Sequence, residues 1–158
     1  MTPDVFQSIC RLLDGECIQY RTIRHQPTYT SEESAKARGE AVRVGGKALV
    51  VKTGEAFRLF VLSAAAKLDS GALKRHFGEK KIRFATPAEL MDLTGLVPGS
   101  IPPFGPPVLP FELFVDESSL ANEKIAFNAG SLTDSIVMTT DDYLRVAKPA
   151  RLRFSAEA

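Results

Sequence analysis

Hydrophobic positions near the start of the chain recur every three to four residues, which is the spacing of one face of an α-helix. These positions are Val5, Phe6, Ile9, Leu12 and Leu13. Gly15 follows them, and glycine commonly ends a helix. The pattern predicts an amphipathic helix that packs one side against a core.

Capping signals predict four more helices where the hydrophobic pattern is weaker. Each begins at a side chain that can accept a hydrogen bond from the first turn, and three of them end at a glycine. The predicted helices run from Thr30 to Gly39, from Asp69 to Gly78, from Thr86 to Gly95 and from Thr140 towards Val146. Thr30 with Glu33, and Thr86 with Glu89, have the spacing of a capping box.

Runs rich in β-branched and aromatic residues predict strands between these helices. The runs are residues 18–24, 47–52, 56–62, 82–85, 111–116, 124–128, 135–139 and 151–154. The second and third are separated only by Thr53-Gly54-Glu55, which predicts a β-hairpin. Strands and helices alternate without a regular βαβ period. We therefore predict a single α+β domain over residues 1–158, with a mixed, mostly antiparallel, curved or barrel-like sheet flanked by short helices.

Composition narrows the class of protein. Of the 158 residues, 44% are hydrophobic and 25% are charged, which is typical of a soluble globular domain. No run approaches the roughly 18 apolar residues of a membrane span, and residues 1–14 do not resemble a secretory signal, so we predict a cytoplasmic protein without a membrane partner. The net charge of +1 argues against DNA binding and against extensive wrapping of any nucleic acid.

Several common chemistries are excluded by missing residues. A P-loop around Gly45-Gly46-Lys47 would need glycine at Ala41 and a hydroxyl at Ala48. There is no GxSxG elbow, and neither His25 nor His76 has partners at metal-ligand spacing, so we expect no metal and no organic cofactor. Cys10 fits a buried small hydrophobe better than a nucleophile, although a hydrolase using Cys10 or Cys17 stays a minor alternative.

Three features remain that suit an anion or an oxyanion. Lys47 begins an apolar strand, residues 98–110 hold six of the ten prolines, and Asn128-Ala129-Gly130-Ser131 forms a glycine-containing turn. Backbone N–H groups in such loops can stabilise developing negative charge. Each feature also has an ordinary interpretation: a charge on an edge strand, a stiff crossover and a hairpin turn.

The order of several motifs resembles the YbaK / prolyl-tRNA-synthetase-associated editing-domain family. In chain order they are His25-Gln26-Pro27-Thr28-Tyr29-Thr30, Lys47-Ala48-Leu49-Val50-Val51, Lys67-Leu68-Asp69, Phe84-Ala85-Thr86-Pro87-Ala88-Glu89-Leu90, Thr94-Gly95-Leu96-Val97-Pro98-Gly99-Ser100-Ile101-Pro102-Pro103-Phe104-Gly105, Phe127-Asn128-Ala129-Gly130-Ser131 and Thr140-Asp141-Asp142-Tyr143-Leu144. The resemblance covers most of the chain.

The resemblance implies a free-standing, trans-editing aminoacyl-tRNA deacylase that hydrolyses the ester of a small amino acid mischarged on tRNA. Its implied partners are the tRNA acceptor end and, as a second candidate, an aminoacyl-tRNA synthetase. It assigns Lys47 to anchoring the terminal phosphate or orienting the ester, and Gly99 to backbone contacts with the ester. It assigns substrate contacts to His25, Tyr29, Ser100, Ile101, Pro102, Phe104, Gly105, Asn128, Ala129, Gly130 and Ser131.

Two departures from the family pattern bear on specificity. Ser100 stands where a second glycine is common, and we expect its hydroxyl to narrow or polarise the pocket. Ala48 stands where the alanine-specific branch has asparagine, which argues against alanine and leaves Cys, Ser, Thr and other small amino acids open. The alternative from another class is a non-catalytic module whose pocket binds a tRNA 3′ end, a nucleotide or a synthetase.

Overall fold

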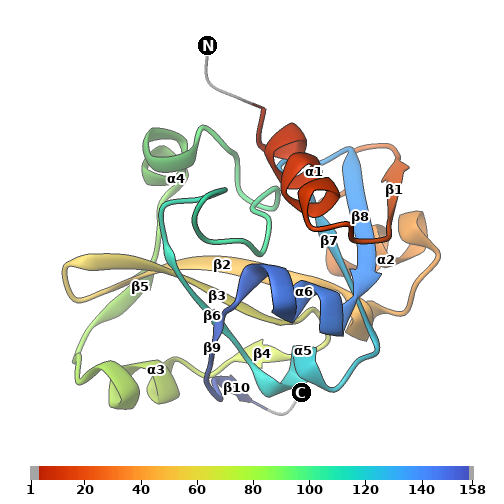
Figure 1. The fold of residues 1–158 in the computed structure, drawn as a ribbon. Coiled ribbons are helices and arrows are strands. Elements are labelled where there is room, and N and C mark those ends of the chain that lie inside the picture. Colours follow the sequence, from red (N-terminus) through yellow and green to blue (C-terminus); the bar gives the residue numbers. More distant parts are fainter. Residues whose placement is uncertain (1–3, 157–158) are drawn as a thin grey trace.

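A long β-hairpin forms the centre of the molecule (Figure 1). The computed structural model describes residues 4–156. The hairpin strands are β2 (Gly46–Thr53) and β3 (Ala56–Ser63), and they belong to a five-stranded sheet of order β5-β2-β3-β6-β9. The other members are β5 (Ile82–Phe84), β6 (Glu112–Val115) and β9 (Ala150–Arg151). Pairing is antiparallel except between β3 and β6 and between β6 and β9.

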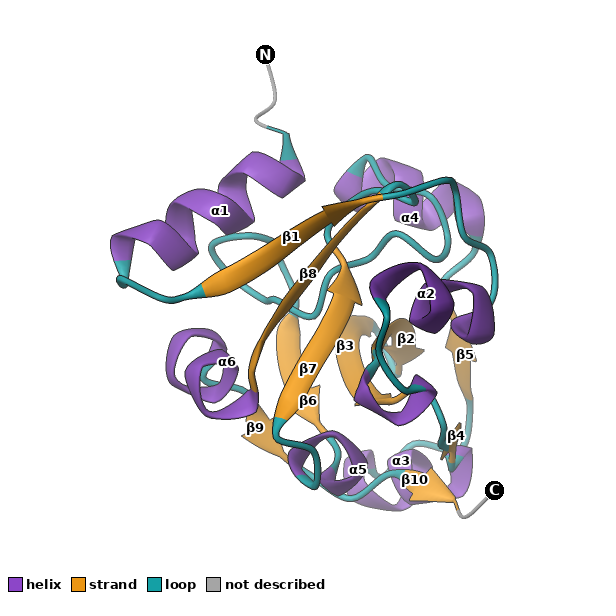
Figure 2. Cartoon of the chain, turned by 90° about the vertical axis from the view of Figure 1, so that its right-hand side faces the viewer, coloured by secondary structure: helices purple, strands orange, loops and turns teal. Residues whose placement is uncertain are grey.

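A second sheet of three antiparallel strands lies at one end of the hairpin (Figure 2). Its order is β1 (Tyr20–Arg24), β8 (Asp134–Thr139) and β7 (Lys124–Asn128). A parallel bridge between Gly45 and Ala126 links it to the start of β2. A two-stranded pair joins β4 (Lys67–Leu68) to β10 (Ser155–Ala156). The mixed, mostly antiparallel α+β class is confirmed, but the described strands do not close into a barrel.

Helices flank the sheets where hydrophobic spacing and capping signals predicted them, except that the last helix is capped by Thr139, one residue before the predicted Thr140. They are α1 (Val5–Gly15), α2 (Ser31–Arg38), α3 (Ser70–Phe77), α4 (Pro87–Thr94) and α6 (Thr140–Ala147). The predicted capping box of α4 is complete. In α2 the Thr30 hydroxyl accepts from the N–H of Glu33, but the Glu33 carboxylate accepts from the N–H of Tyr29. This contact fixes the chain just before the helix.

Three short elements escaped the sequence pattern, and one predicted strand is wrong. The additional elements are a 3₁₀ turn at Val42–Val44, the strand β4 and the helix α5 (Glu117–Leu120). The predicted strand over residues 151–154 is instead split between β9 and β10. Phe154 lies between them and is fully buried against the Phe60 ring, so core packing sets the path of this segment.

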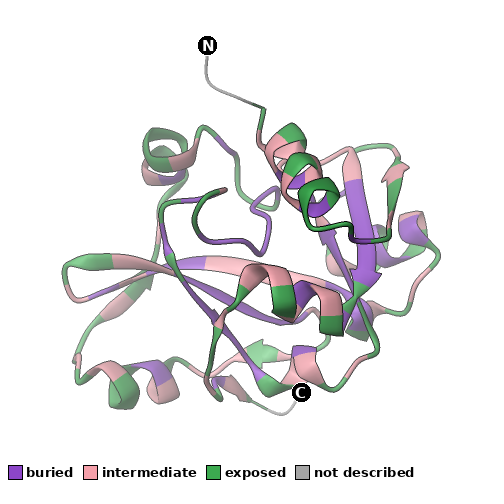
Figure 3. Cartoon of the chain, in the orientation of Figure 1, coloured by how far each residue is buried: buried purple, intermediate pink, exposed green. Residues whose placement is uncertain are grey.

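Much of the proline-rich loop is buried (Figure 3). Ile101, Phe104, Leu109 and Phe111 are buried in the main core. The buried Tyr143 hydroxyl donates to the carbonyl of Pro103 at 2.6 Å. A loop with this anchoring presents a fixed backbone, which is what a binding site on a loop requires.

Gly105→Ala is expected to destabilise the fold by about 2 kcal/mol, because a Cβ there would lie 2.6 Å from the backbone oxygen of Phe111. Urea denaturation measures the loss. Gly15→Ala is the matched control, since nothing lies within 4 Å of its added Cβ. Equal stability of the two variants would contradict the close packing of this loop.

Candidate active site

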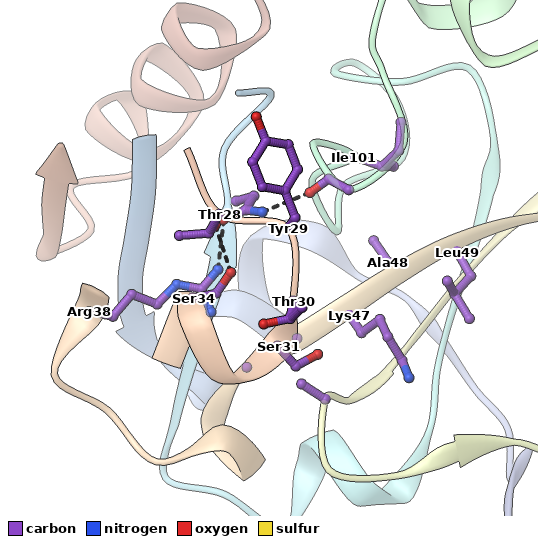
Figure 4. A pocket seen from close by; sticks show the side chains of 15 residues that line it. Thr28, Tyr29, Thr30, Ser31, Ser34, Arg38, Lys47, Ala48, Leu49 and Ile101 are labelled. Atoms are coloured by element: carbon purple, nitrogen blue, oxygen red, sulfur yellow. Dashed lines mark hydrogen bonds between the residues drawn. The ribbon is translucent and has the colours of Figure 1, made fainter. Parts of the chain in front are cut away.

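A cavity of about 230 Å³ lies where the two larger sheets meet beside α2. Its walls come from one face of α2 and the residues before it, from the start of β2, from the end of β7 and from the proline-rich loop (Figure 4). The lining residues are Thr28, Tyr29, Thr30, Ser31, Ser34, Arg38, Gly45, Gly46, Lys47, Ala48, Leu49, Ala64, Gly99, Ile101 and Asn128. A cavity of this size suits a small group such as an aminoacyl ester.

Lys47 reaches the cavity from the second residue of β2. Its side chain is half-buried, and its ammonium donates to the carbonyl of Ala66 at 3.2 Å. No carboxylate lies within 4.0 Å of it among residues 4–156. Burial lowers the pKa of Lys47 from its ordinary value of 10.5. The site therefore holds an ammonium whose charge is not neutralised by a neighbour.

Close packing explains the two glycines before Lys47. A Cβ at Gly46 would come within 2.7 Å of the Ile125 side chain, and one at Gly45 would come within 3.0 Å of Ala64. Gly46 therefore lets β2 approach β7, and Gly45 lets the chain pass close to Ala64. The approach to β7 brings Lys47 and Asn128 to the same cavity. The sequence pattern Gly45-Gly46-Lys47 thus serves strand packing instead of phosphate binding by a P-loop.

The loop at Gly99 is joined to the turn at Asn128 by hydrogen bonds. The Asn128 amide donates to the carbonyl of Gly99 at 2.7 Å, and the N–H of Gly130 donates to the carbonyl of Ser100 at 3.0 Å. Gly99 has φ +87°, a backbone conformation that other residues seldom adopt. The two segments that the sequence singled out are therefore one rigid wall.

Five of the predicted site residues line the cavity. They are Tyr29, Lys47, Gly99, Ile101 and Asn128. Tyr29 stands at the rim with 75% of its surface exposed, whereas Ile101 is buried.

The other eight predicted site residues do not line the cavity, and their assignment to substrate contact stays a prediction. Ser100 is buried, and its hydroxyl donates to the carbonyl of Val97 at 2.7 Å. The hydroxyl thus bonds within its own loop, whereas we expected it to narrow or polarise the pocket. The remaining seven are outside the cavity lining. They are His25, Pro102, Phe104, Gly105, Ala129, Gly130 and Ser131.

Sequence reasoning missed the wall formed by Thr28 and α2. Thr28, Ser34 and Arg38 are all buried. The signal was the composition of α2, which has almost no apolar side chain. Such a helix must pack against the rest of the protein through polar side chains. Ser34 and Arg38 are four residues apart and therefore share one helix face.

The family model for the aminoacyl-tRNA editing domain matches residues 25–146, which include every lining residue of the cavity. The chain belongs to this aminoacyl-tRNA editing domain family.

Individual relatives agree with this membership. Over 165 aligned residues the chain is 36% identical to the Multifunctional Ser/Thr-tRNA deacylase ProXp-y of Escherichia coli (strain K12), with 96% of this chain and 93% of the relative covered. It is 27% identical to the Prolyl-tRNA editing protein ProX of Acetoanaerobium sticklandii, with 99% and 98% covered. A solved structure of a candidate trans-editing enzyme for prolyl tRNA synthetase shares the fold, with a TM-score of 0.83, 24% identity and 99% of both chains covered.

Two further observations concern metal ligands and membrane spans. Within residues 4–156, no group of three or more His, Cys, Asp or Glu side chains is placed to hold a metal ion. The same part of the chain has no helix with the length and apolar character needed to cross a membrane.

Proposed function

We propose that this editing domain is a free-standing aminoacyl-tRNA deacylase that hydrolyses a small aminoacyl ester in the cavity beside Lys47. The observation that carries the proposal is the placement of Lys47, Gly99 and Asn128 around one small cavity within the family region. The aminoacyl group enters the cavity, and the tRNA acceptor end stays outside. A cytoplasmic location and a synthetase partner follow only as parts of this proposal.

The reaction needs positioning and charge stabilisation more than a nucleophile of the protein. An aminoacyl ester is already activated, so attack by water or by a neighbouring hydroxyl of the substrate suffices once the carbonyl is held. The cavity wall includes hydroxyl side chains at Thr28, Thr30, Ser31 and Ser34, but no histidine or carboxylate that would activate one of them. Both the lining and the reaction therefore favour hydrolysis without a covalent intermediate.

Lys47 and the Gly99 loop take complementary roles in this proposal. The ammonium of Lys47 holds the terminal phosphate or the ester oxygen, where negative charge is present or develops. The rigid backbone around Gly99 fixes the position of the ester. Tyr29, exposed at the rim, offers a face on which the terminal adenine can stack.

The substrate class is narrowed by a relative and by the cavity wall. The Escherichia coli relative is named as a Ser/Thr-tRNA deacylase. Hydroxyl and amide groups occupy the α2 side of the cavity, whereas Ala48, Leu49 and Ile101 supply an apolar side. A wall of this mixed kind suits a short side chain that carries a hydroxyl, so seryl and threonyl esters are the proposed substrates.

A deacylation panel tests the proposal. The purified protein is mixed at catalytic concentration with tRNAs charged with Ala, Cys, Ser or Thr, on cognate and non-cognate tRNA bodies. We expect rapid loss of seryl and threonyl esters and at least about 10-fold slower loss of alanyl esters. Inertness towards every ester would contradict the enzyme and favour the alternative module that binds a tRNA 3′ end without turnover.

A further inference from the structure

Arg38 is a buried cation on the α2 wall of the cavity, and neutral groups hold it. Its Nε donates to the hydroxyl of Ser135 at 3.0 Å, and its Nη2 donates to the side-chain oxygen of Asn128 at 2.9 Å. Only 7% of the residue is exposed. Figure 4 places its guanidinium on the α2 side of the cavity, well separated from the ammonium of Lys47.

The third nitrogen of the guanidinium is not used by the fold. Within residues 4–156, Nη1 makes no hydrogen bond, and no carboxylate lies within 4.0 Å of Arg38. A Cβ built at Gly45 would lie 3.5 Å from Nη1, so the lining glycine marks where this nitrogen sits at the cavity wall. Among residues 4–156, Nη1 is not one of the buried side-chain atoms that lack a partner, so it is open to the cavity and a ligand acceptor can replace water there.

The charge of Arg38 persists at neutral pH. Burial lowers its pKa to about 10, which still leaves the guanidinium protonated near pH 7. A guanidinium has only donors, so its partner must be an oxygen or another acceptor. The lining residues include two cations and no carboxylate, which disfavours placing the α-ammonium of an aminoacyl group beside Arg38.

The hydroxyls next to Arg38 extend this polar wall. The buried Ser34 hydroxyl donates to the hydroxyl of Thr28 at 2.8 Å. Ser34 and Arg38 lie one helical turn apart on α2. A ligand oxygen beside Arg38 would therefore meet polar groups on one side, and the apolar side of the cavity would accept carbon atoms.

We propose that Arg38 determines specificity, with Nη1 donating a hydrogen bond to the side-chain oxygen of a bound seryl or threonyl group. The inference rests on the proposed function, since it names the residue that reads the substrate of that same cavity. An alanyl group offers no acceptor there and leaves Nη1 without a partner. Discrimination by a missing hydroxyl can be large when the site is built to bind it.

A purely positioning role for Arg38 makes a different prediction. Through Asn128, Arg38 also orients the amide that holds the Gly99 carbonyl, so its loss can disturb the loop. Such a disturbance lowers the affinity for seryl and alanyl groups by the same factor. If Arg38 binds the hydroxyl directly, its loss lowers the affinity for the seryl group far more than the affinity for the alanyl group.

The experiment compares binding of two non-hydrolysable probes by calorimetry: 3′-seryl-amino-adenosine and 3′-alanyl-amino-adenosine, each with an amide in place of the ester. We expect the unmodified protein to bind the seryl probe about 10- to 100-fold tighter, as for a hydrogen bond to a charged group. Arg38→Met keeps an apolar stem but removes every donor. In this variant the ratio of the affinity for the seryl probe to the affinity for the alanyl probe is expected to fall to about one. Arg24→Met, at an exposed position in β1, is the control.

The outcomes separate the two proposals. An unchanged ratio in a folded Arg38→Met variant, or an equal loss for both probes, overturns the role of Arg38. If the unmodified protein binds neither probe, the proposed function fails, whereas equal binding of both overturns the specificity assignment alone. If Arg38→Met does not fold, Arg38→Lys is measured instead. The lysine ammonium is a single nitrogen and cannot occupy the separate positions of Nε, Nη2 and Nη1, so the ratio of the seryl to the alanyl affinity is expected to fall as well.

Discussion

Lys47→Ala is expected to lower kcat/KM for deacylation by at least about 10²- to 10³-fold, the usual cost of removing one charge-stabilising donor. In the proposed mechanism the ammonium of Lys47 is one of only two cations at the cavity wall, and Arg38 lies on the other side. With alanine at position 47, β2 supplies no side chain that could bind a phosphate or an ester oxygen. Single-turnover hydrolysis of seryl-tRNA measures the loss.

The variant is expected to fold, because Lys47 contributes little to stability. Its ammonium makes one hydrogen bond, to Ala66, and no ion pair within residues 4–156. Losing it costs about 1 kcal/mol or less. Lys74→Ala, at an exposed position of α3, is the matched control and is expected to keep full activity. Full activity of a folded Lys47→Ala variant would contradict the proposed site.

The pH dependence of the reaction gives a second readout of Lys47. Because burial lowers its pKa below 10.5, the side chain loses its charge at a lower pH than a free lysine does. Activity that depends on the ammonium therefore falls on the alkaline side, with the inflection below 10.5. In Lys47→Ala the residual activity should lack this inflection.

Local signals in the sequence predicted the elements whose ends are set locally. Thr30, Asp69 and Thr86 each accept a hydrogen bond in the first turn of the helix that they were predicted to begin. The hairpin of β2 and β3 follows from the Gly54 turn and two apolar runs. Such signals depend on residues that are close in sequence, so one sequence is enough to identify them.

Contacts between distant segments could not be predicted in this way. The parallel pairing of β3 with β6 joins residues about fifty positions apart, and its register depends on the whole core. The residues of the cavity wall also come from segments that are far apart in the sequence. Arg38 meets Asn128 and Ser135 only because α2 packs beside β7 and β8, and no local pattern in the sequence encodes that contact.

The family motifs include five residues that line the cavity, but they also include residues with a structural role. Gly105 lies in the most specific motif, and its role in the structure is the close approach to Phe111. Phe104 packs against the rings of Phe127 and Tyr143 in the core. A motif on a rigid loop mixes residues that face the ligand with residues that hold the loop, and only the three-dimensional structure separates them.

Asp116→Ala is expected to destabilise the protein by about 4 kcal/mol, the largest effect on stability that we predict. Asp116 is fully buried at the end of β6. One carboxylate oxygen accepts from the N–H groups of Phe154 and Ser155, and the other accepts from the N–H of Ser118. Alanine removes the cap of α5 and leaves two further backbone donors without a partner, at about 1–3 kcal/mol for each buried group.

The pH dependence of stability identifies the charge of Asp116 as the cause. Burial raises its pKa, but the hydrogen bonds from Ser118, Phe154 and Ser155 outweigh burial and hold the pKa below its ordinary value of 3.8. A carboxylate with a lowered pKa in the folded state contributes its full stabilisation above the unfolded value. That contribution is lost as the pH falls through the folded pKa.

Urea denaturation of the unmodified protein and of Asp116→Asn, at pH 7 and at about pH 3, tests this assignment. The asparagine keeps one acceptor oxygen but cannot carry the charge, so it is expected to be less stable at pH 7. The difference between the two proteins should shrink at about pH 3, because the carboxyl of the unfolded chain, with a pKa of about 3.9, then binds a proton and the stabilisation by the charged form begins to be lost. A difference that is constant with pH would show that the shape of the side chain, and not its charge, holds the C-terminal segment against β6.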